Sequence, residues 1–387
     1  MGLEAAALGA AAAAGLAVPE LVAVDDGPVL GSAGMVMSRV EGETLARRIL
    51  RDPAFAGARA ALTGQLASFL AGLHRIPLSA VPGLPEPDPL NHLEELYAEV
   101  DDVSPTFDTA LRWLAARRPP GRAGDRAVVH GDLRLGNVIV APDGLKAVID
   151  WELVHAGDPV EDLAWACVKA WRFGAAPEVA GVGTIDELLA AYEAAGGLAV
   201  DRATFDWWLV EKTLQWGIFC MKQAAAHLTG ADRSVELAAI GRRVAEQEWD
   251  LLELLDPGGR PPIPEAGPRP AAEGDLYGRP TIDELVEAVD EFLTGPVSEA
   301  TDGQVRFHTR VAANVLRTVA RQLRAGPVPE ARARQALEDF GVGSLAGLSA
   351  AIRGGDFDDR RGELYPFLWS TVADRLAVAN PRHLGKG

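Results

Sequence analysis

The chain has 387 residues, which is enough for two or three domains and a substantial buried core. Its hydrophobic content of 48% is that of an ordinary globular protein, and its net charge of −18 argues against a surface that coats nucleic acid. The charge is uneven, because residues 1–278 carry almost all of it and the remainder is nearly neutral. These values predict at least two structural units and no nucleic-acid partner.

The cysteine content and the N-terminus indicate where the chain resides. Cys167 and Cys220 allow at most one disulfide and form no metal-type pair, which fits a reducing cytoplasm. The apolar N-terminal stretch ends at Pro19 and contains Glu4 but no lysine or arginine. It is therefore typical of neither a signal peptide nor a membrane span. We expect a cytoplasmic protein with no membrane partner, and the sequence does not predict its oligomeric state.

Apolar periodicity and turn residues predict a mixture of strands and helices in residues 1–149. The expected helices are 3–14, one that begins near an N-cap at Thr44, 58–76, 90–101 and 106–117. The expected strands are 19–24, 34–40, 127–129, 138–140 and 146–149. The last two strands form a hairpin, because Pro-Asp-Gly between them is strong turn chemistry.

The rest of the chain is expected to be helical, apart from a linker at 256–280 that is rich in proline and glycine. The expected helices are 160–173, 184–196, 202–229, 233–255, 281–293, 305–323, 329–340, 345–353 and 362–378. Helix 305–323 carries a polar stripe at Arg306, Arg310 and Asn314 and is expected to bury Phe307. That stripe is either a solvated face or a surface that faces a substrate or the other lobe.

Chemistry gathers in the segment VVHGDLRLGNVIV, residues 128–140, where a polar insert separates two apolar runs. Asp150 ends the second strand of the following hairpin, so it should lie near Asn137 at the start of the first. A carboxylate and an amide oxygen at one point suit Mg²⁺ shared with substrate phosphates. Asp132 can then orient or deprotonate a substrate hydroxyl. This set predicts phosphoryl transfer, which needs mainly alignment and charge neutralisation.

The spacing of these residues resembles a known family. His130, Asp132, Asn137 and a strand-end aspartate resemble the catalytic loop and metal segment of the protein-kinase-like fold. The forms HGD, IDWE and GDPVEDLAW are similar to the aminoglycoside phosphotransferase/choline kinase family, and especially to kinase-like domains fused to acyl-CoA dehydrogenases. The resemblance covers residues 3–255. The tail resembles an uncharacterised helical domain appended to bacterial phosphotransferases.

The resemblance implies an α+β, protein-kinase-like bilobal fold with an N-terminally truncated small lobe, a mostly helical large lobe and a C-terminal all-α domain. The implied division is a partial N-lobe at 1–40, a helical C-lobe with the catalytic loop at 41–255, the linker at 256–280 and the helical C-terminal domain at 281–384. A docking or regulatory role is expected for the last domain.

The resemblance also implies roles for single residues, with ATP and Mg²⁺ as cofactors. Asp132 matches the catalytic aspartate, while Asn137 and Asp150 match the Mg²⁺ ligands in the nucleotide site. Arg134 stands where a cation neutralises the transferred phosphate. The nucleotide base is expected against the backbone of Met37, Ser38 and Arg39.

Three further residues are assigned by the resemblance or weighed beside it. Asp162 matches an aspartate that hydrogen-bonds the backbone of the catalytic loop. His130 is expected to brace that loop rather than to react. Glu152 is either a substrate contact or a solvated surface residue.

One expected part is missing from the sequence. Residues 1–145 contain no lysine, so Glu4, which matches the glutamate that pairs with a phosphate-binding lysine, lacks that partner. Either the start is misassigned or truncated, which we favour, or the chain is a degenerate kinase-like protein. An in-frame upstream stretch with a glycine-rich turn and a strand lysine would support the first explanation.

The leading hypothesis is a Mg²⁺-dependent kinase that phosphorylates a hydroxyl group of a small molecule with ATP, impaired in this chain by the missing lysine. The alternative is a non-catalytic kinase-like binding protein that docks a partner through its C-terminal helices. A metal-dependent hydrolase is a weaker third hypothesis, because no carboxylate bridge for two metals is evident. The acceptor stays open between an aminoglycoside, a hydroxyacyl-CoA and other alcohols.

Overall fold

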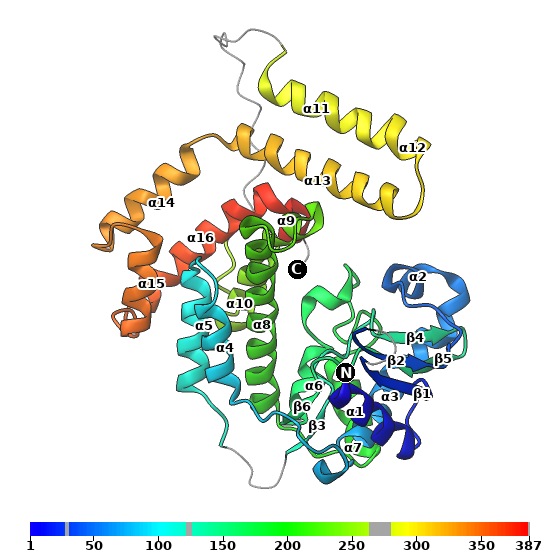
Figure 1. The fold of residues 1–387 in the computed structure, drawn as a ribbon. Helices are drawn as coiled ribbons and strands as arrows, with labels where there is room; N and C mark the ends of the chain where they lie inside the picture. Colours follow the sequence, from blue (N-terminus) through cyan, green and yellow to red (C-terminus); the bar gives the residue numbers. More distant parts are fainter. Residues whose placement is uncertain (28–30, 121–125, 263–279, 386–387) are drawn as a thin grey trace. The chain divides into compact units, whose positions relative to one another are not determined.

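The computed structural model describes residues 1–27, 31–120, 126–262 and 280–385, which divide into two compact units (Figure 1). Unit 1 comprises residues 1–92 and 117–213, and unit 2 comprises residues 93–116 and 214–387. The chain therefore passes between the units three times. Most of the expected linker, residues 263–279, lies outside the described residues, and the domain bounds implied by the resemblance stay predictions.

Unit 1 combines short strands with helices. Its strands are β1 (Leu21–Asp26), β2 (Ala33–Met37), β3 (Ala127–Val129), β4 (Val138–Ala141), β5 (Gly144–Val148) and β6 (His155–Gly157). Its helices are α1 (Gly2–Ala13), α2 (Ala46–Arg51), α3 (Ala56–Leu73), α6 (Val160–Trp165), α7 (Ile185–Ala194) and the first part of α8 (Arg202–Thr229). The strands pair antiparallel in twos, as β1–β2, β3–β6 and β4–β5.

Two strand pairs position the segment VVHGDLRLGNVIV. The β4–β5 hairpin pairs Val138 with Val148, and it packs on α3, where the helical spacing buries Leu62, Leu66 and Phe69. Strand β6 was not expected from the sequence, and it pairs with β3 so that Val129 lies opposite His155. The polar insert consequently connects the end of one buried pair to the start of the other.

The expected N-cap at Thr44 is wrong. Helix α2 begins at Ala46 with Leu45 as its N-cap residue. The preceding Glu43 exchanges two backbone hydrogen bonds with Val140 of β4, and its carboxylate accepts from the amides of Thr44 and Leu45. Glu43 thus fixes this bend by pairing with the hairpin, which is a long-range contact that local capping patterns do not reveal.

All the secondary-structure elements that the structure describes in unit 2 are helices, which turns and loops connect. It holds most of α4 (Pro89–Ala98), α5 (Pro105–Ala116), the rest of α8, α9 (Val235–Gly241), α10 (Val244–Leu255), α11 (Ile282–Phe292), α12 (Ser298–Ala300), α13 (Gly303–Ala325), α14 (Val328–Asp339), α15 (Leu345–Gly354), α16 (Arg361–Ala379) and α17 (Pro381–Leu384). The expected helix 233–255 is interrupted at Gly241, where a Cβ would lie 2.6 Å from that of Ala224 in α8. The expected helix 160–173 in unit 1 likewise ends at Trp165.

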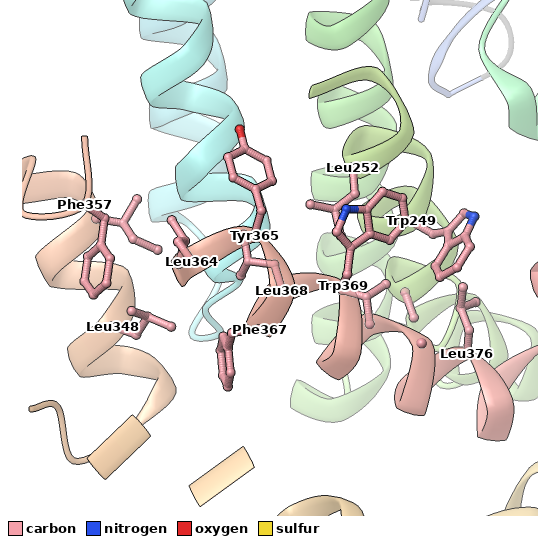
Figure 2. Close-up of a cluster of buried hydrophobic side chains, with 14 of the residues drawn as sticks. Trp249, Leu252, Leu348, Phe357, Leu364, Tyr365, Phe367, Leu368, Trp369 and Leu376 are labelled. Carbon is pink, nitrogen blue, oxygen red and sulfur yellow. The ribbon is translucent and has the colours of Figure 1, made fainter. Parts of the chain in front are cut away.

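The core of unit 2 joins helices that are far apart in sequence. Figure 2 shows Trp249 and Leu252 of α10 packed with Leu368, Trp369 and other side chains of α16. The rings of Trp249 and Trp369 meet edge to face with their centroids 4.8 Å apart, a favoured aromatic geometry. Among the helices that the structure describes, none is both long enough and apolar enough to cross a membrane.

Candidate active site

The loop between β3 and β4 begins with a backbone conformation that requires glycine. Gly131 has a φ of +83°, and a Cβ at this position would lie 2.6 Å from the carbonyl oxygen of Leu153. Both the left-handed backbone and the close approach exclude larger residues. Gly131 thus allows the chain to turn sharply beside Leu153, which precedes β6, and Asp132 follows directly after this turn.

Asp162, near the start of α6, stabilises this turn by hydrogen bonds to its backbone. Its carboxylate accepts the amide of His130 at 2.8 Å and that of Gly131 at 2.9 Å. Burial acts to raise the pKa of Asp162, but the hydrogen bond and charge of His74, together with His130 and the amide of Gly131, lower it. The ionised form is therefore favoured, and the predicted hydrogen bonds from the catalytic-loop backbone to Asp162 are confirmed.

His74 and Tyr192 extend this support, and no pattern in the sequence singles out either residue. His74 follows α3 and places Nε2 3.2 Å from Asp162, while its Nδ1 lies 2.8 Å from the Tyr192 hydroxyl. The three residues come from different helices, α3, α6 and α7, so their contact depends on tertiary packing. A lone histidine at a helix end carries no spacing signal that could have identified it.

His130 braces the loop, as expected. Its Nδ1 accepts the amide of Asp132 at 3.1 Å, which makes Nε2 the protonated nitrogen that donates to the Ile149 carbonyl at 3.2 Å. Burial lowers the pKa of His130, although Asp162 and Asp132 act to raise it. The neutral imidazole thus links the catalytic loop to the end of the hairpin, just before Asp150.

Three side-chain N–H donors hold the carboxylate of Asp132. Its Oδ1 accepts from Arg134 Nε at 3.0 Å and from Trp165 Nε1 at 2.8 Å, and its Oδ2 accepts from Asn137 Nδ2 at 2.6 Å. Burial raises the pKa of Asp132 despite the opposing effects of Arg134 and Trp165. A fixed carboxylate with a raised pKa is suited to accept a proton from an alcohol.

Arg134 lies against this carboxylate and over an aromatic ring. Its guanidinium carbon is 4.9 Å from the ring centroid of Trp171. The stacking holds the cation beside Asp132 while the side chain keeps partial solvent access. Arg134 is therefore placed next to the carboxylate, in agreement with their proximity in sequence.

Asn137 and Asp150 lie at one end of the β4–β5 hairpin. The carbonyl of Asn137 accepts the amide of Ile149 at 2.9 Å, so Asp150 is the next residue along the opposite strand. Asn137 Nδ2 bonds to Asp132, and no hydrogen bond from the described residues reaches its Oδ1. Asp150 is exposed at a φ of +70°, and its carboxylate has no hydrogen bond or ion pair with a described residue. These two oxygen donors fit the ligand preference of Mg²⁺.

The carboxylates around this end of the hairpin influence one another. Burial raises the pKa of exposed Glu152, and the charges of Asp150, Asp132 and Glu4 raise it further. Within the described ranges, no group of three or more histidine, cysteine or acidic side chains forms a metal cluster. Of the described residues, Asn137 and Asp150 are the ligands that a cation held here would use, and it would share its other positions with a ligand.

The segment expected to meet a nucleotide base stands apart from these contacts. Met37 ends β2, Ser38 exchanges hydrogen bonds with Glu20, and Arg39 pairs with Glu41 at 3.2 Å. No hydrogen bond or ion pair described in the structure joins them to the catalytic loop. Their role in binding a nucleotide stays a prediction.

The missing lysine has no substitute from the hairpin. The first lysine of the sequence, Lys146, pairs with Asp143 at 2.6 Å in the turn region. Glu4 instead accepts a hydrogen bond from the backbone amino group of Met1 at 3.0 Å. Among the described residues up to 146, no lysine therefore pairs with Glu4.

A separate cavity of about 370 Å³ lies at the other end of the β3–β6 pair. Its lining includes Arg126, Gly157, Glu161 and Trp208, and it includes none of Asp132, Asn137 and Asp150. Because none of these three side chains lines the cavity, we place the candidate active site at the loop between β3 and β4 and assign no ligand to the cavity.

The comparison with protein families agrees with the geometry of the loop. A model described as the phosphotransferase enzyme family matches residues 2–208. The chain belongs to this phosphotransferase family. A second model, a domain of unknown function named DUF6285, matches residues 299–383 and thus corresponds to the uncharacterised tail.

Individual relatives of this phosphotransferase-family chain carry two kinds of name. Acyl-CoA dehydrogenase family member 11 from Gallus gallus is 27% identical over 271 residues, which are 62% of this chain and 34% of the relative. An aminoglycoside 3'-phosphotransferase from Escherichia coli is 29% identical over 41% of this chain and 60% of the relative. The chain spans about a third of the length of the acyl-CoA dehydrogenase relative. Both resemblances stated from the sequence are confirmed.

A solved structure supports the fold. A Ralstonia eutropha protein named after the aminoglycoside phosphotransferases superposes with a TM-score of 0.55 at 21% identity, covering 64% of this chain and 82% of its own. The expected protein-kinase-like fold with an additional helical C-terminal region is confirmed. The roles of the individual site residues remain predictions.

Proposed function

We propose that this phosphotransferase-family chain transfers the terminal phosphoryl group of ATP to a hydroxyl group of a small molecule. The observation that carries the proposal is the buried Asp132 carboxylate, held by three N–H donors beside Asn137 at the end of the hairpin that leads to Asp150. Family membership supports a kinase-type reaction. In this arrangement Asp132 is a fixed proton acceptor, and Asn137 and Asp150 supply oxygen donors at one end of the hairpin.

Each residue has a distinct part in this proposal. Asp132 orients the acceptor hydroxyl and accepts its proton, for which its raised pKa is suited. Arg134 offsets negative charge on the transferred group, because its guanidinium already lies beside Asp132. Asp162 and His74 keep the loop backbone in position. Alignment of this kind supplies much of the rate enhancement in phosphoryl transfer.

Asn137 and Asp150 would hold Mg²⁺, and when bound this ion would neutralise charge on the nucleotide phosphates. Asn137 is oriented for this by its own amide group, since Nδ2 donates to Asp132 and leaves Oδ1 as the acceptor. The backbone of Met37, Ser38 and Arg39 would contact the base. Because residues 1–145 supply no lysine for the phosphates, we expect this 387-residue chain to bind ATP weakly.

The relatives' names suggest two classes of acceptor, and other alcohols stay open beside them. One relative is named for aminoglycosides, which are cationic, and others are named for acyl-CoA dehydrogenases, which makes a hydroxyacyl-CoA the other option. The acidic residues near the loop favour a cationic acceptor, since they would repel the phosphates of CoA. An assay must therefore contain both classes.

The experiment is a transfer assay with labelled ATP, Mg²⁺ and a panel of aminoglycosides and hydroxyacyl-CoA thioesters. Asp132→Asn should lower kcat by about 10²- to 10⁴-fold, which is the usual contribution of a positioned proton acceptor. Asp143→Asn is the matched control, because Asp143 is exposed in the hairpin turn and pairs only with Lys146 among the described residues. This control should retain the wild-type rate.

Two outcomes would contradict the proposal. If Asp132→Asn transferred phosphate as fast as the wild type, the role of Asp132 would be wrong. If the wild-type chain bound neither ATP nor an acceptor and catalysed no transfer, the non-catalytic binding protein would become the better hypothesis. The lack of a lysine in residues 1–145 is the observation that favours this second candidate.

A further inference from the structure

Helix α6 contacts the catalytic loop through two of its residues. Asp162 accepts two backbone amides of the loop. Trp165 lies three positions later, on the same face of the helix, and donates its indole N–H to Oδ1 of Asp132 at 2.8 Å. One turn of helix therefore fixes both the backbone of the loop and the side chain of its central carboxylate.

The Trp165 side chain belongs to a closed ring of contacts around this carboxylate. It is buried, and a buried indole N–H needs an acceptor, which here is Asp132. The ring of Trp165 packs against that of Trp171 with the centroids 5.4 Å apart, and the guanidinium of Arg134 lies over Trp171. Arg134 in turn donates from Nε to the same Oδ1 at 3.0 Å. Each of the four side chains thus restrains the next, so the carboxylate has little freedom to rotate.

The hydrogen-bond donors are distributed unequally over the two oxygens of Asp132. A carboxylate oxygen has two lone pairs that accept hydrogen bonds. Oδ1 accepts from both Trp165 and Arg134, so both of its lone pairs are used. Among the described residues Oδ2 accepts only from Nδ2 of Asn137, at 2.6 Å, which leaves one lone pair. The Asp132 side chain is 10% exposed, so this remaining position can be reached by a substrate.

We propose that Trp165 is a positioning residue for phosphoryl transfer, which holds Oδ1 of Asp132 so that Oδ2 meets the acceptor hydroxyl. This inference rests on the proposed function. In the transfer step the hydroxyl proton moves to Oδ2, the hydroxyl oxygen forms a bond to the terminal phosphorus of ATP, and the bond from that phosphorus to ADP breaks. Without the indole donor the carboxylate would rotate more freely, and fewer bound substrates would be aligned for the reaction.

The experiment compares Trp165→Phe with the wild-type 387-residue chain in the transfer assay with labelled ATP, Mg²⁺ and the acceptor panel. The substitution keeps an aromatic side chain beside Trp171 but removes the N–H donor. We expect kcat to fall by about 10- to 100-fold, the factor that corresponds to the loss of one hydrogen bond to a charged group. The KM values for ATP and the acceptor should change by less than about 2-fold, because Trp165 acts through Asp132 and binds neither substrate.

Trp369→Phe is the matched control. Trp369 is as buried as Trp165, and it donates its indole N–H to the carboxylate of Asp256 at 2.9 Å within unit 2. The control therefore deletes the same kind of hydrogen bond and the same side-chain volume, and it should retain the wild-type kcat. Urea denaturation should show similar losses of stability in the two variants. A fall in kcat confined to Trp165→Phe is then no consequence of general destabilisation.

A second measurement does not depend on activity. In ¹H–¹⁵N NMR spectra of the full chain with labelled tryptophan, the indole signal that is missing from Trp165→Phe belongs to Trp165. This signal should move upfield in Asp132→Asn, because a neutral amide oxygen is a weaker acceptor than a carboxylate. The signal of Trp369 should not move. In the Asp132→Asn background, Trp165→Phe should change kcat by less than about 2-fold, since the residue acts through the carboxylate.

Several outcomes would overturn the role of Trp165. These are a Trp165 signal that does not respond to Asp132→Asn, a kcat of Trp165→Phe equal to that of Trp369→Phe, and an equal loss of kcat in the wild-type and Asp132→Asn backgrounds. If Trp165→Phe failed to fold, Trp165→Met, which also lacks an N–H donor, would take its place. A wild type that transfers no phosphate would instead contradict the proposed function, and the role of Trp165 would fail with it.

Discussion

Buried carboxylates occur in both units, but they bind different kinds of donor. In unit 1, Asp162 accepts two backbone amides of the catalytic loop as well as a bond from His74. In unit 2, Asp108 and Glu248 pair with the guanidinium groups of Arg353 and Arg375 at 2.8 and 2.6 Å. The first arrangement determines the shape of a loop, whereas the second fastens helices together.

The two kinds of contact also differ in how far apart in the sequence their partners lie. Asp162 lies about thirty residues from the amides that it accepts. Arg353 and Arg375 lie within the DUF6285 match. Their guanidinium groups pair with carboxylates on helices α5 and α10, which lie more than 120 residues earlier in the sequence. Their carboxylate partners are buried, so the cations of the C-terminal region compensate charges that the earlier helices cannot expose to water. The comparison teaches that this tail is part of the core of unit 2.

The largest effect is expected at the loop. Asp162→Ala removes the acceptor of two amides and the partner of His74, and it should lower the free energy of unfolding by about 3–5 kcal/mol. Urea denaturation measures the loss, and transfer activity should fall with it because the loop is no longer held. Asp186→Ala is the control, since Asp186 is almost fully exposed and should change stability by less than about 0.5 kcal/mol. A loss no larger than that of the control would contradict the role of Asp162.

A smaller effect is expected in unit 2. Arg375→Ala leaves buried Glu248 with only the Ser104 hydroxyl as a hydrogen-bond donor among the described residues. Because the arginine itself is 44% exposed, the expected loss is about 1–3 kcal/mol rather than that of a fully buried pair. Arg332→Ala is the matched control, as its pair with Asp374 is at the surface and should contribute less than about 1 kcal/mol. Equal losses in the two variants would show that Glu248 does not depend on its cation.

The smallest effect concerns pH and a second charged cluster of unit 1. His155 faces two acceptors, the Leu153 carbonyl at 2.8 Å and the Glu161 carboxylate at 3.1 Å, which together favour the doubly protonated ring. Burial and Lys212 oppose this, but Glu161 prevails and raises the pKa of His155. Lys212 in turn contacts Glu211, whose pKa burial raises to about 7 despite this lysine.

A raised pKa in the folded state means that His155 stabilises the protein below its unfolded pKa of about 6.5, and that this contribution disappears as the pH rises through the folded value. The stability of the wild type relative to His155→Gln should therefore decline as the pH rises from about 6.5 through the raised pKa of His155 in the folded protein. Glu211 titrates in both proteins, and the charge of His155 lowers its pKa, so the difference reports on the coupled His155–Glu211 cluster. A pH-independent difference would show that the His155 ring is not charged.

The sequence predicted the parts of the site that depend on local spacing. The proximity of Asp132 and Arg134 and the hairpin that brings Asn137 near Asp150 follow from residues close together in the chain. The resemblance added the hydrogen bonds of Asp162, which the structure confirms. Helix positions were mostly correct for the same reason, because periodicity is a local signal.

What the sequence missed depends on tertiary contact. His74, at the end of α3, reaches Asp162, and Tyr192 of α7 reaches His74. Glu43 determines the start of α2 by pairing with Val140. The exposure of apolar Ile282 and Leu285 on α11 was also not recognised, since an amphipathic pattern does not say which face the neighbouring helix covers. The prediction that Phe307 is buried is wrong, because its side chain is 49% exposed. The assignments of Met37, Ser38 and Arg39 to a nucleotide rest on the resemblance alone and stay predictions.

Helix α5 belongs to the phosphotransferase match by sequence and to the C-terminal helices by packing. Its Asp108 is fully buried and meets Arg353, which lies in the DUF6285 match. A substitution at position 108 is therefore expected to depend on the residue at position 353, and the reverse. Across related two-part chains, the residues at positions 108 and 353 should covary, whereas in phosphotransferases that lack the tail position 108 should be free to lose its charge.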